Sequence, residues 1–158
     1  MKRLVAFLSL AALCLLSTEA LSQTTFTGAI SQDWGEAGNW TNGLPAPGND
    51  ATIPLGLGVS IEGSLIIEFN IDNYGAITIS PFGVIQNYGA IANYESIINY
   101  GSITNIDTID NYGGIIENYE LFENYGGITM DNFGVIQNFE TIANYGYIFN
   151  YGYIINEG

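Results

Sequence analysis

The stretch that decides the fold is Asn87 to Ile103, NYGAIANYESIINYGSI, in which one six-residue repeat is written three times. Each copy reads Asn, Tyr, Gly or Glu, a small residue, Ile and a filler. Six residues is not a helical period, because steps of about 100° per residue place successive Ile side chains on different faces. Six is an even number, so in an extended chain every Ile points to the same side. The repeat therefore predicts short β-strands.

The same repeat runs from about residue 61 to the end of the sequence. The aliphatic residue mostly recurs after six residues. A step of eight leads to the Ile within each copy of the motif FGVIQN, at Phe82–Asn87 and Phe133–Asn138. Repetition this regular favours a stacked-repeat architecture. The expected core residues are Ile85, Ile91, Ile97, Ile103, Ile109, Ile115, Ile136, Ile142, Ile148 and Ile154, with Leu121 and Ile128 between them.

The expected fold is all-β, a single-stranded parallel β-helix (β-solenoid) built from hexapeptide-like N-Y/F-G/E-x-I-x repeats with an irregular N-terminal cap. In such a coil Ile stacks on Ile, and each Asn amide donates to the Asn of the next coil. Asn and Gly tolerate left-handed backbone angles, so the Asn-Tyr-Gly triplet is expected to bend the chain. Alternation of Gly and acidic residues after Tyr favours two repeats per coil, whereas the need for an interior favours three and a triangular coil of 18 residues.

Alternation places Tyr on the side opposite to Ile, facing water, where rings of successive coils could stack. The candidate interaction face comprises Tyr88, Tyr94, Tyr100, Tyr112, Tyr145 and Tyr151.

Residues 1–22 have the pattern of a secretory signal peptide: a basic start, the apolar run Leu4–Leu16, and small residues before a cut after Ser22. The alternative is a membrane anchor, but the 13 apolar residues fall short of the roughly 20 that span a bilayer. A lipoprotein cut at Cys14 is disfavoured, because Leu13 is too large for the preceding position. The expected location is secreted, extracellular or at the cell surface.

The sequence has 16 acidic residues, two basic residues and no His, a formal net charge of −14. Both basic residues and the single Cys lie in the leader, so the mature chain would carry no cationic side chain and no thiol. Nucleic-acid binding is not expected, because no cation can displace phosphate counterions, and anionic membrane surfaces are disfavoured likewise. No membrane span is expected in the mature chain, and no disulfide can form in it.

Three sections are expected: the signal peptide at 1–22, a cap segment at 23–60 and the solenoid at 61–158. The first coil of a solenoid has an open strand edge, and terminal units are normally atypical. Trp34 and Trp40 are expected to form a structural cap over that apolar end. The alternative is that the two rings form a carbohydrate platform.

The repeat resembles hexapeptide-type β-solenoids in its period and inward aliphatic residue, although it lacks the His base of the acyltransferases. The segment Phe26–Pro54 resembles the opening segment of secreted, adhesin-like β-solenoid proteins of Bacteroidetes-type bacteria. The matching pattern, W…NW…G.P…D…I, comprises Trp34, Asn39, Trp40, Gly43, Pro45, Asp50 and Ile53. The resemblance implies secretion and a surface setting, and many such proteins carry a C-terminal sorting domain, which is not visible here.

Catalysis is not expected, because only carboxylates and tyrosines can be tuned for proton transfer after residue 22. Glu95 with Glu140, or Asp107 with Glu120, could pair as in a glycosidase, but they recur with the repeat, as solvated corner residues would. No catalytic, cofactor-binding or metal-binding residue is assigned. Acidic residues stacked along the coil could still collect Ca²⁺ through their oxygen atoms. These residues are Asp107, Asp110, Glu117, Glu120 and Glu123.

Repeat, leader and composition predict a non-enzymatic secreted or cell-surface protein with a structural or adhesive role. A glycan or cell-surface partner and end-to-end self-association are the expected interactions. The alternative is a glycan- or ice-binding β-solenoid that uses flat Tyr, Asn and Thr faces. An enzyme is the third and least favoured class.

Overall fold

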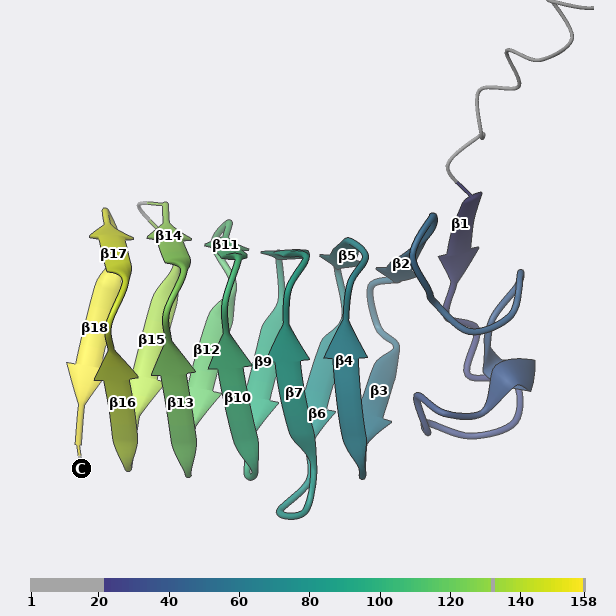
Figure 1. Cartoon of the computed structure of the whole chain (residues 1–158), viewed down its shortest axis with the longest axis horizontal. Helices are drawn as coiled ribbons and strands as arrows, with labels where there is room; N and C mark the ends of the chain where they lie inside the picture. Colours follow the sequence, from purple (N-terminus) through teal and green to yellow (C-terminus); the bar gives the residue numbers. More distant parts are fainter. Residues whose placement is uncertain (1–21, 132, 158) are drawn as a thin grey trace, which may run out of the picture.

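The computed structural model describes residues 22–131 and 133–157 and shows an all-β parallel solenoid of about five turns (Figure 1). The expected signal peptide lies outside the described residues, apart from Ser22. Along the repeat, each strand pairs in parallel with the strand three elements further along the chain, so three strands and three bends make one coil. Asn87, for example, pairs with Asn105, 18 residues on. The triangular coil is therefore confirmed.

Three parallel sheets run along the stack. Sheet 1 contains β1 (Ser22–Thr25), β2 (Asn49–Ile53), β5 (Ile71–Asn73), β8 (Ala90–Asn93), β11 (Thr108–Asn111), β14 (Gly127–Met130) and β17 (Tyr147–Asn150). Sheet 2 contains β4 (Ser64–Ile67), β7 (Val84–Asn87), β10 (Ser102–Asn105), β13 (Leu121–Asn124) and β16 (Thr141–Asn144). Sheet 3 contains β3 (Gly58–Ile61), β6 (Ala76–Ile79), β9 (Ser96–Asn99), β12 (Ile115–Asn118), β15 (Val135–Asn138) and β18 (Tyr153–Asn156).

The strand pattern explains the core. In β8 to β11 the second residue, Ile, and the fourth, Asn, are buried, while the first and third are partly exposed. Burying this apolar column is the main favourable term in folding. The expected core residues that are at most 3% exposed are Ile85, Ile91, Ile97, Ile103, Ile109, Ile128 and Ile136.

One expected core residue is on the wrong face. Ile115 lies outside and is 42% exposed, whereas Ile116 is 1% exposed. The bend before this strand contains the extra residue Gly114, which moves the inward position forward by one. The same one-residue shift carries into the next strand, so Leu121 lies outside and Phe122 occupies the core position.

Three further expected core residues lie in the last described coil and are incompletely covered. Ile142 and Ile148 pack against the core but are only partly buried. Ile154 is 45% exposed although it pairs with Ile136, which is 0% exposed. The reason is that no further coil covers them in the part of the chain that the structure describes.

Buried Asn side chains form ladders between coils. In sheet 2, each Nδ2 donates to the next Oδ1 at 2.8 Å, from Asn87 through Asn105 and Asn124 to Asn144. Sheet 3 has the same ladder from Asn99 to Asn156, at 2.7–2.8 Å. The sheet 1 ladder stops at Asn111, because the next inward residue is Met130. These bonds satisfy polar groups whose burial would otherwise be costly.

The bends differ from the expected left-handed turns. Among the described residues no non-glycine residue has a positive φ, and within the Asn-Tyr-Gly bends Gly113 alone does. Gly is required at the other bends for space: a Cβ at Gly89 would overlap the carbonyl oxygen of Phe69, and one at Gly101 that of Gly83. The backbones of successive coils approach too closely there for a side chain.

The N-terminal segment closes one end of the stack (Figure 1). β1 adds a parallel strand to sheet 1, and Asp33 forms a parallel bridge with Ser60 of sheet 3. Trp34 and Trp40 are 6% and 5% exposed, and their rings pack edge to face with centroids 4.8 Å apart. Because both rings are buried, they cannot serve as a carbohydrate platform.

Other residues of the N-terminal pattern hold this cap in shape. Asn39 is fully buried, and its Oδ1 accepts the backbone N–H groups of Ile30 and Ser31 at 2.9 Å each. Gly43 has φ +76°, in the left-handed region that favours glycine. The Asp50 carboxylate accepts the backbone N–H of Asn70 at 2.8 Å. The pattern therefore has a structural explanation at these positions.

The coil begins earlier than the boundary expected at residue 61. β2 and β3 pair in parallel with β5 and β6 and form the first coil. Their inward residues Ile53, Val59 and Ile61 are buried. These strands lack the Asn-Tyr-Gly triplet, so a count of triplets does not detect them.

Candidate functional site

The outer surface carries columns of aromatic rings at the three corners of the triangle. Corners 1, 2 and 3 are the bends that follow the strands of sheets 1, 2 and 3. Ring centroids lie 4.5 Å apart for Tyr74–Tyr94 and 5.1 Å for Tyr94–Tyr112 at corner 1. At corner 2, Tyr125 and Tyr145 stack at 4.9 Å. These distances follow from the roughly 4.8 Å between paired strands.

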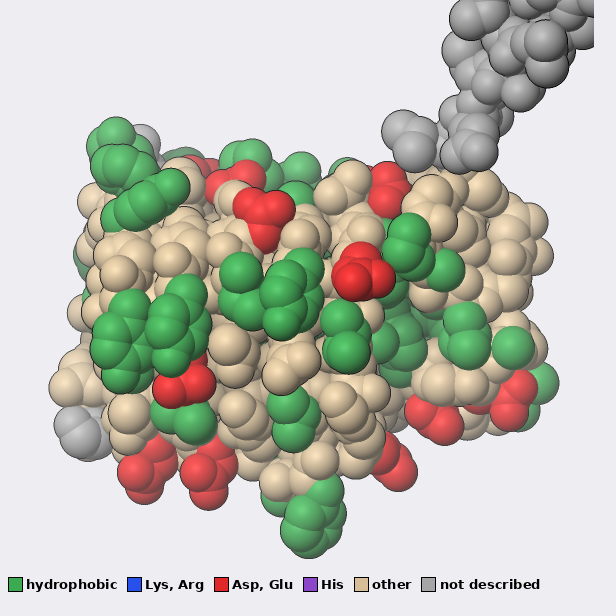
Figure 2. All heavy atoms as spheres, viewed as in Figure 1, with side chains coloured by type: hydrophobic (Ala, Val, Ile, Leu, Met, Phe, Trp, Pro, Cys, Tyr) green, Lys and Arg blue, Asp and Glu red, His purple; other side chains and the backbone are tan. Residues whose placement is uncertain are grey.

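Corner 3 has a mixed column. Tyr100 stacks on Tyr119 with centroids 4.9 Å apart, and Tyr119 stacks on Phe139 at 4.5 Å. Figure 2 shows hydrophobic side chains lying side by side in groups along the stack, with acidic side chains between them. Stacked rings of this kind contribute about 0.5–1.5 kcal/mol per pair beyond their burial.

The six tyrosines of the expected interaction face do not share one face. Successive repeats fall on successive corners, so only every third repeat returns to the same one. The structure places Tyr94, Tyr112 and Tyr151 at corner 1, Tyr88 and Tyr145 at corner 2, and Tyr100 at corner 3. All six are 39–68% exposed. Within a column the faces between neighbouring rings are occupied by stacking, so the column presents mainly ring edges and hydroxyl groups to a ligand.

Carboxylates lie beside several of these phenols. Asp110 Oδ2 accepts from the Tyr112 hydroxyl at 3.4 Å, and Glu117 Oε2 accepts from the Tyr119 hydroxyl at 3.4 Å. The charge of Asp110 is the main cause that raises the pKa of Tyr112. Loss of hydration against the neighbouring rings is the main cause that raises the pKa of Tyr94 and Tyr119. The raised pKa values keep the Tyr94, Tyr112 and Tyr119 phenols in their neutral form at physiological pH.

The acidic residues considered for catalysis do not converge. Glu95 lies at corner 1 and Glu140 at corner 3, while Asp107 lies at corner 2 and Glu120 at corner 3. The five acids considered for Ca²⁺ are likewise spread over the three sheets and two of the bends. The described residues contain no group of three or more Asp, Glu, His or Cys side chains placed to hold a metal ion.

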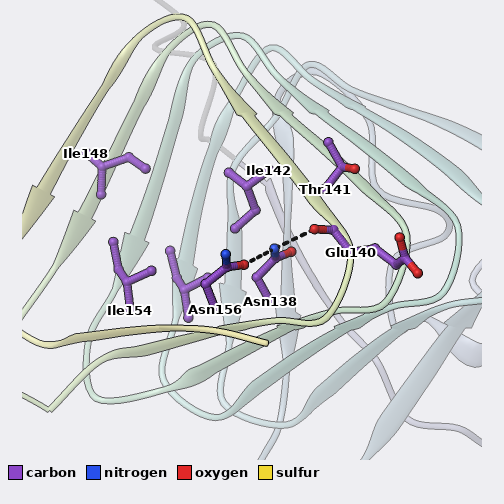
Figure 3. Close-up of a pocket in the computed structure, with 8 residues that line it drawn as sticks. Asn138, Glu140, Thr141, Ile142, Ile148, Ile154 and Asn156 are labelled. Atoms are coloured by element: carbon purple, nitrogen blue, oxygen red, sulfur yellow. Dashed lines mark hydrogen bonds between the residues drawn. The ribbon is translucent and has the colours of Figure 1, made fainter. Parts of the chain in front are cut away.

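The last described coil contains a shallow cavity of about 320 Å³ at its open side. Figure 3 shows Ile142, Ile148 and Ile154 directed into this space, with Asn138 and Asn156 at its edge. Asn138 Nδ2 donates to the Glu140 carbonyl oxygen and to Asn156 Oδ1, both at 2.7 Å. The lining is therefore that of the solenoid interior, and it lacks the convergent polar groups of a small-molecule site.

The outer positions of this coil are also unusual. Tyr147, Phe149, Tyr153 and Ile155 are 43–65% exposed. The residues that pair with them one coil earlier are Gly127, Thr129, Val135 and Gln137. The last coil is thus more aromatic on its outside than the coil before it, and its rings of Tyr151 and Tyr153 have no stacked partner among the described residues.

Two bends of the repeat are longer than its Asn-Tyr-Gly bends, and each carries an exposed Phe. The loop between β6 and β7 projects from the stack (Figure 1), and Phe82 on it is 88% exposed. Phe133, on the loop between β14 and β15, is 77% exposed. These are the two FGVIQN copies, so the eight-residue steps in the sequence correspond to loops added at a corner.

No family model matches the chain, and no curated protein or solved structure is significantly similar to it. The fold therefore rests on the structure alone, and the resemblance of Phe26–Pro54 to Bacteroidetes-type adhesin-like proteins remains a prediction. No helix in the described ranges combines the length and the hydrophobicity that crossing a bilayer requires.

Proposed function

We propose that this chain is a non-enzymatic, secreted or cell-surface structural and adhesive repeat protein. The observation that carries the proposal is the continuous triangular coil, whose inner aliphatic column runs through the stack and whose Asn ladders join successive coils from the second coil onward. A seven-stranded sheet at about 4.8 Å per strand makes a spacer roughly 30 Å long. Such a spacer holds its outer side chains in a fixed array.

In this proposal the contacts to partners lie on the last described coil. Its edge strands β16, β17 and β18, the exposed Ile154 and the unstacked aromatic rings are the features that a glycan, a cell-surface partner or a second copy would cover. End-to-end self-association would use the same coil, because β1 and the Trp cap already cover the other end. The export pattern of residues 1–22 and the adhesin-like resemblance favour an extracellular setting.

A binding assay tests the proposal. The processed chain is expected to bind cells, immobilised glycans or itself at micromolar concentration, measured by cell adhesion, glycan array and sedimentation. Tyr153→Ser in the last coil is expected to weaken that binding, whereas Tyr88→Ser, in a middle coil, leaves it unchanged. Absence of binding in all three assays would remove the proposal's support.

Glycan binding is the second candidate, favoured by the free ring faces of Tyr151 and Tyr153, 68% and 65% exposed. Open aromatic faces are what a sugar ring stacks on, whereas stacking covers the faces between neighbouring rings in the corner columns. Ice binding has less support, because the outer rows of the sheets mix Thr with acidic and aliphatic residues, as in Thr52, Asp72 and Ala92. Thermal hysteresis and a glycan array distinguish the two.

A further inference from the structure

The corner columns bring phenols from distant parts of the sequence into ring contact. Tyr94 and Tyr112 are 18 residues apart, and Tyr125 and Tyr145 are 20 apart, yet their rings lie nearly parallel with centroids 5.1 and 4.9 Å apart. The rings of Tyr100 and Tyr119 are also stacked, with centroids 4.9 Å apart and an interplanar angle of 18°. The partners of these pairs are therefore held together before any reaction takes place.

The columns are also accessible and close to proton acceptors. Tyr94, Tyr100 and Tyr112 are 39–46% exposed, so a soluble oxidant reaches their edges. Asp110 Oδ2 lies 3.4 Å from the Tyr112 hydroxyl, and Glu117 Oε2 lies 3.4 Å from that of Tyr119. A carboxylate at this distance can take the phenol proton when the ring loses an electron.

We propose that the tyrosine columns are oxidative cross-linking sites. A haem peroxidase that uses hydrogen peroxide as its oxidant would join stacked rings of neighbouring coils as dityrosine. Loss of one electron and one proton turns each phenol into a phenoxyl radical, and two radicals combine through the ring carbons next to the oxygen-bearing carbon. Each link replaces two ring C–H bonds by one C–C bond. The two electrons and two protons released reduce one hydrogen peroxide to two water molecules.

Such a link would do what a disulfide cannot do here. The only Cys of the sequence is Cys14, in the expected leader, so the solenoid has no thiol to connect its coils. A dityrosine between adjacent coils closes a loop of about one coil and ties the two coils together covalently. Stacking supplies the proximity, since holding two reactants in contact raises their effective concentration by orders of magnitude.

The chain contains its own control residue. Like the column tyrosines, Tyr88 follows the Asn of its repeat, and its 48% exposure is similar to theirs. Its neighbours at corner 2 are Glu68 on one coil and Ile106 on the other, because Asn87 pairs with Ile67 and with Asn105. Tyr88 therefore has the exposure without the stacked partner, and it should not cross-link within the molecule.

The test treats the dilute, processed chain with a haem peroxidase and hydrogen peroxide, then unfolds it and digests it with a protease that cuts after Asp and Glu. This digestion separates the partners of three pairs, on fragments 73–95 and 111–117, 96–107 and 118–120, and 124–131 and 141–157. Mass spectrometry is expected to find those three fragment pairs joined with the loss of two hydrogen atoms each. Proximity predicts at least about tenfold more of each link in the native chain than in the urea-unfolded chain at the same peroxide dose.

Two conservative variants keep the test decisive. Tyr119→Phe keeps the stacked ring but is expected to abolish the link between 96–107 and 118–120 alone, and Tyr88→Phe is expected to leave all three links unchanged. Circular dichroism checks that each variant is folded. The proposal is overturned if Tyr88 cross-links as readily as the column tyrosines, if the links are only intermolecular, or if unfolding does not reduce them.

Discussion

The two ends of the stack contain similar inward residues but differ in how those residues are covered. At the N-terminal end, Trp34, Trp40 and Phe26 close the coil interior, and Ile53 in the first coil is 0% exposed. At the other end, Ile154 follows the same repeat as Ile136 and pairs with it, yet it is 45% exposed. Burial is therefore a property of the neighbouring coil and not of the repeat itself.

The largest loss of stability is expected when the cap at the N-terminal end is disrupted. Trp40→Ala removes a buried ring that packs on Phe26 and Trp34 and loses its Nε1 hydrogen bond to the Trp34 carbonyl oxygen, 3.0 Å long. We expect a loss of about 3–5 kcal/mol in the free energy of unfolding. Urea denaturation followed by circular dichroism measures it. An unchanged unfolding curve would mean that the cap does not support the solenoid.

The same substitution at equivalent positions compares a covered coil with the open one. Ile136→Ala creates a cavity in a fully buried site and should cost about 3 kcal/mol. Ile154→Ala removes a half-exposed side chain and should cost about 1 kcal/mol or less. Both values come from denaturant unfolding of the two variants. Equal losses would show that the last coil is covered in solution, for instance by a second copy.

The Asn ladders allow a third comparison. Asn118 is fully buried, accepts from Asn99 and donates to Asn138, so Asn118→Ala leaves unpaired groups inside and should cost about 2 kcal/mol. Asn144 accepts from Asn124 in the last coil but is exposed, so water replaces the lost bonds and Asn144→Ala should cost less than about 1 kcal/mol. Thermal unfolding of both variants distinguishes them. A smaller loss at Asn118 would argue against a ladder.

Alkaline pH is expected to lower the stability of the middle coils, which lie between the two ends of the stack. The pKa is raised for Tyr94, Tyr112, Tyr119 and Tyr125, chiefly by the charge of Asp110 for Tyr112 and by loss of hydration for the other three. The folded state thus holds these protons more tightly than the unfolded state. Their contribution to stability is complete below the ordinary pKa of about 10 and is lost as pH rises through the higher folded values. Urea midpoints measured on both sides of pH 10 should therefore fall with pH.

The control for this pH dependence retains the rings. Tyr94→Phe with Tyr112→Phe keeps stacking at corner 1 but removes two of the titrating hydroxyls, so the decline above pH 10 should become shallower. A decline of the same steepness would place its origin outside the columns.

Much of the fold could be predicted because the repeat has an even period. Alternation correctly placed Ile and Asn inside and Tyr outside, and the Asn spacing anticipated the ladders. The misplaced Ile115 also had a signal, since the step from Asn111 to Asn118 is seven residues and shifts the inward position to Ile116. Following the Asn count instead of the nearest Ile would have avoided that error.

Other features had no periodic signal. Phe26 and Asn39 form the cap together with the two Trp residues but lie in the irregular segment, and Phe69, which stacks on Trp34, lies in the bend between β4 and β5. The grouping of the tyrosines was also hidden, because their corners depend on how many repeats complete a coil. Periodicity reports which side of a strand a residue takes, and it does not report which strands become neighbours.

The sequence by itself determined the strand periodicity, the sorting of side chains between inside and outside, and the absence of Lys, Arg and His after residue 22. Those properties are local, since they depend on alternation and composition. Only the tertiary structure decided that three repeats make one coil, that tyrosines about 18–20 residues apart stack as columns, and that glycines are needed where backbones cross closely. The physical reason is that parallel pairing between coils, about 4.8 Å apart, brings together residues that no local pattern relates.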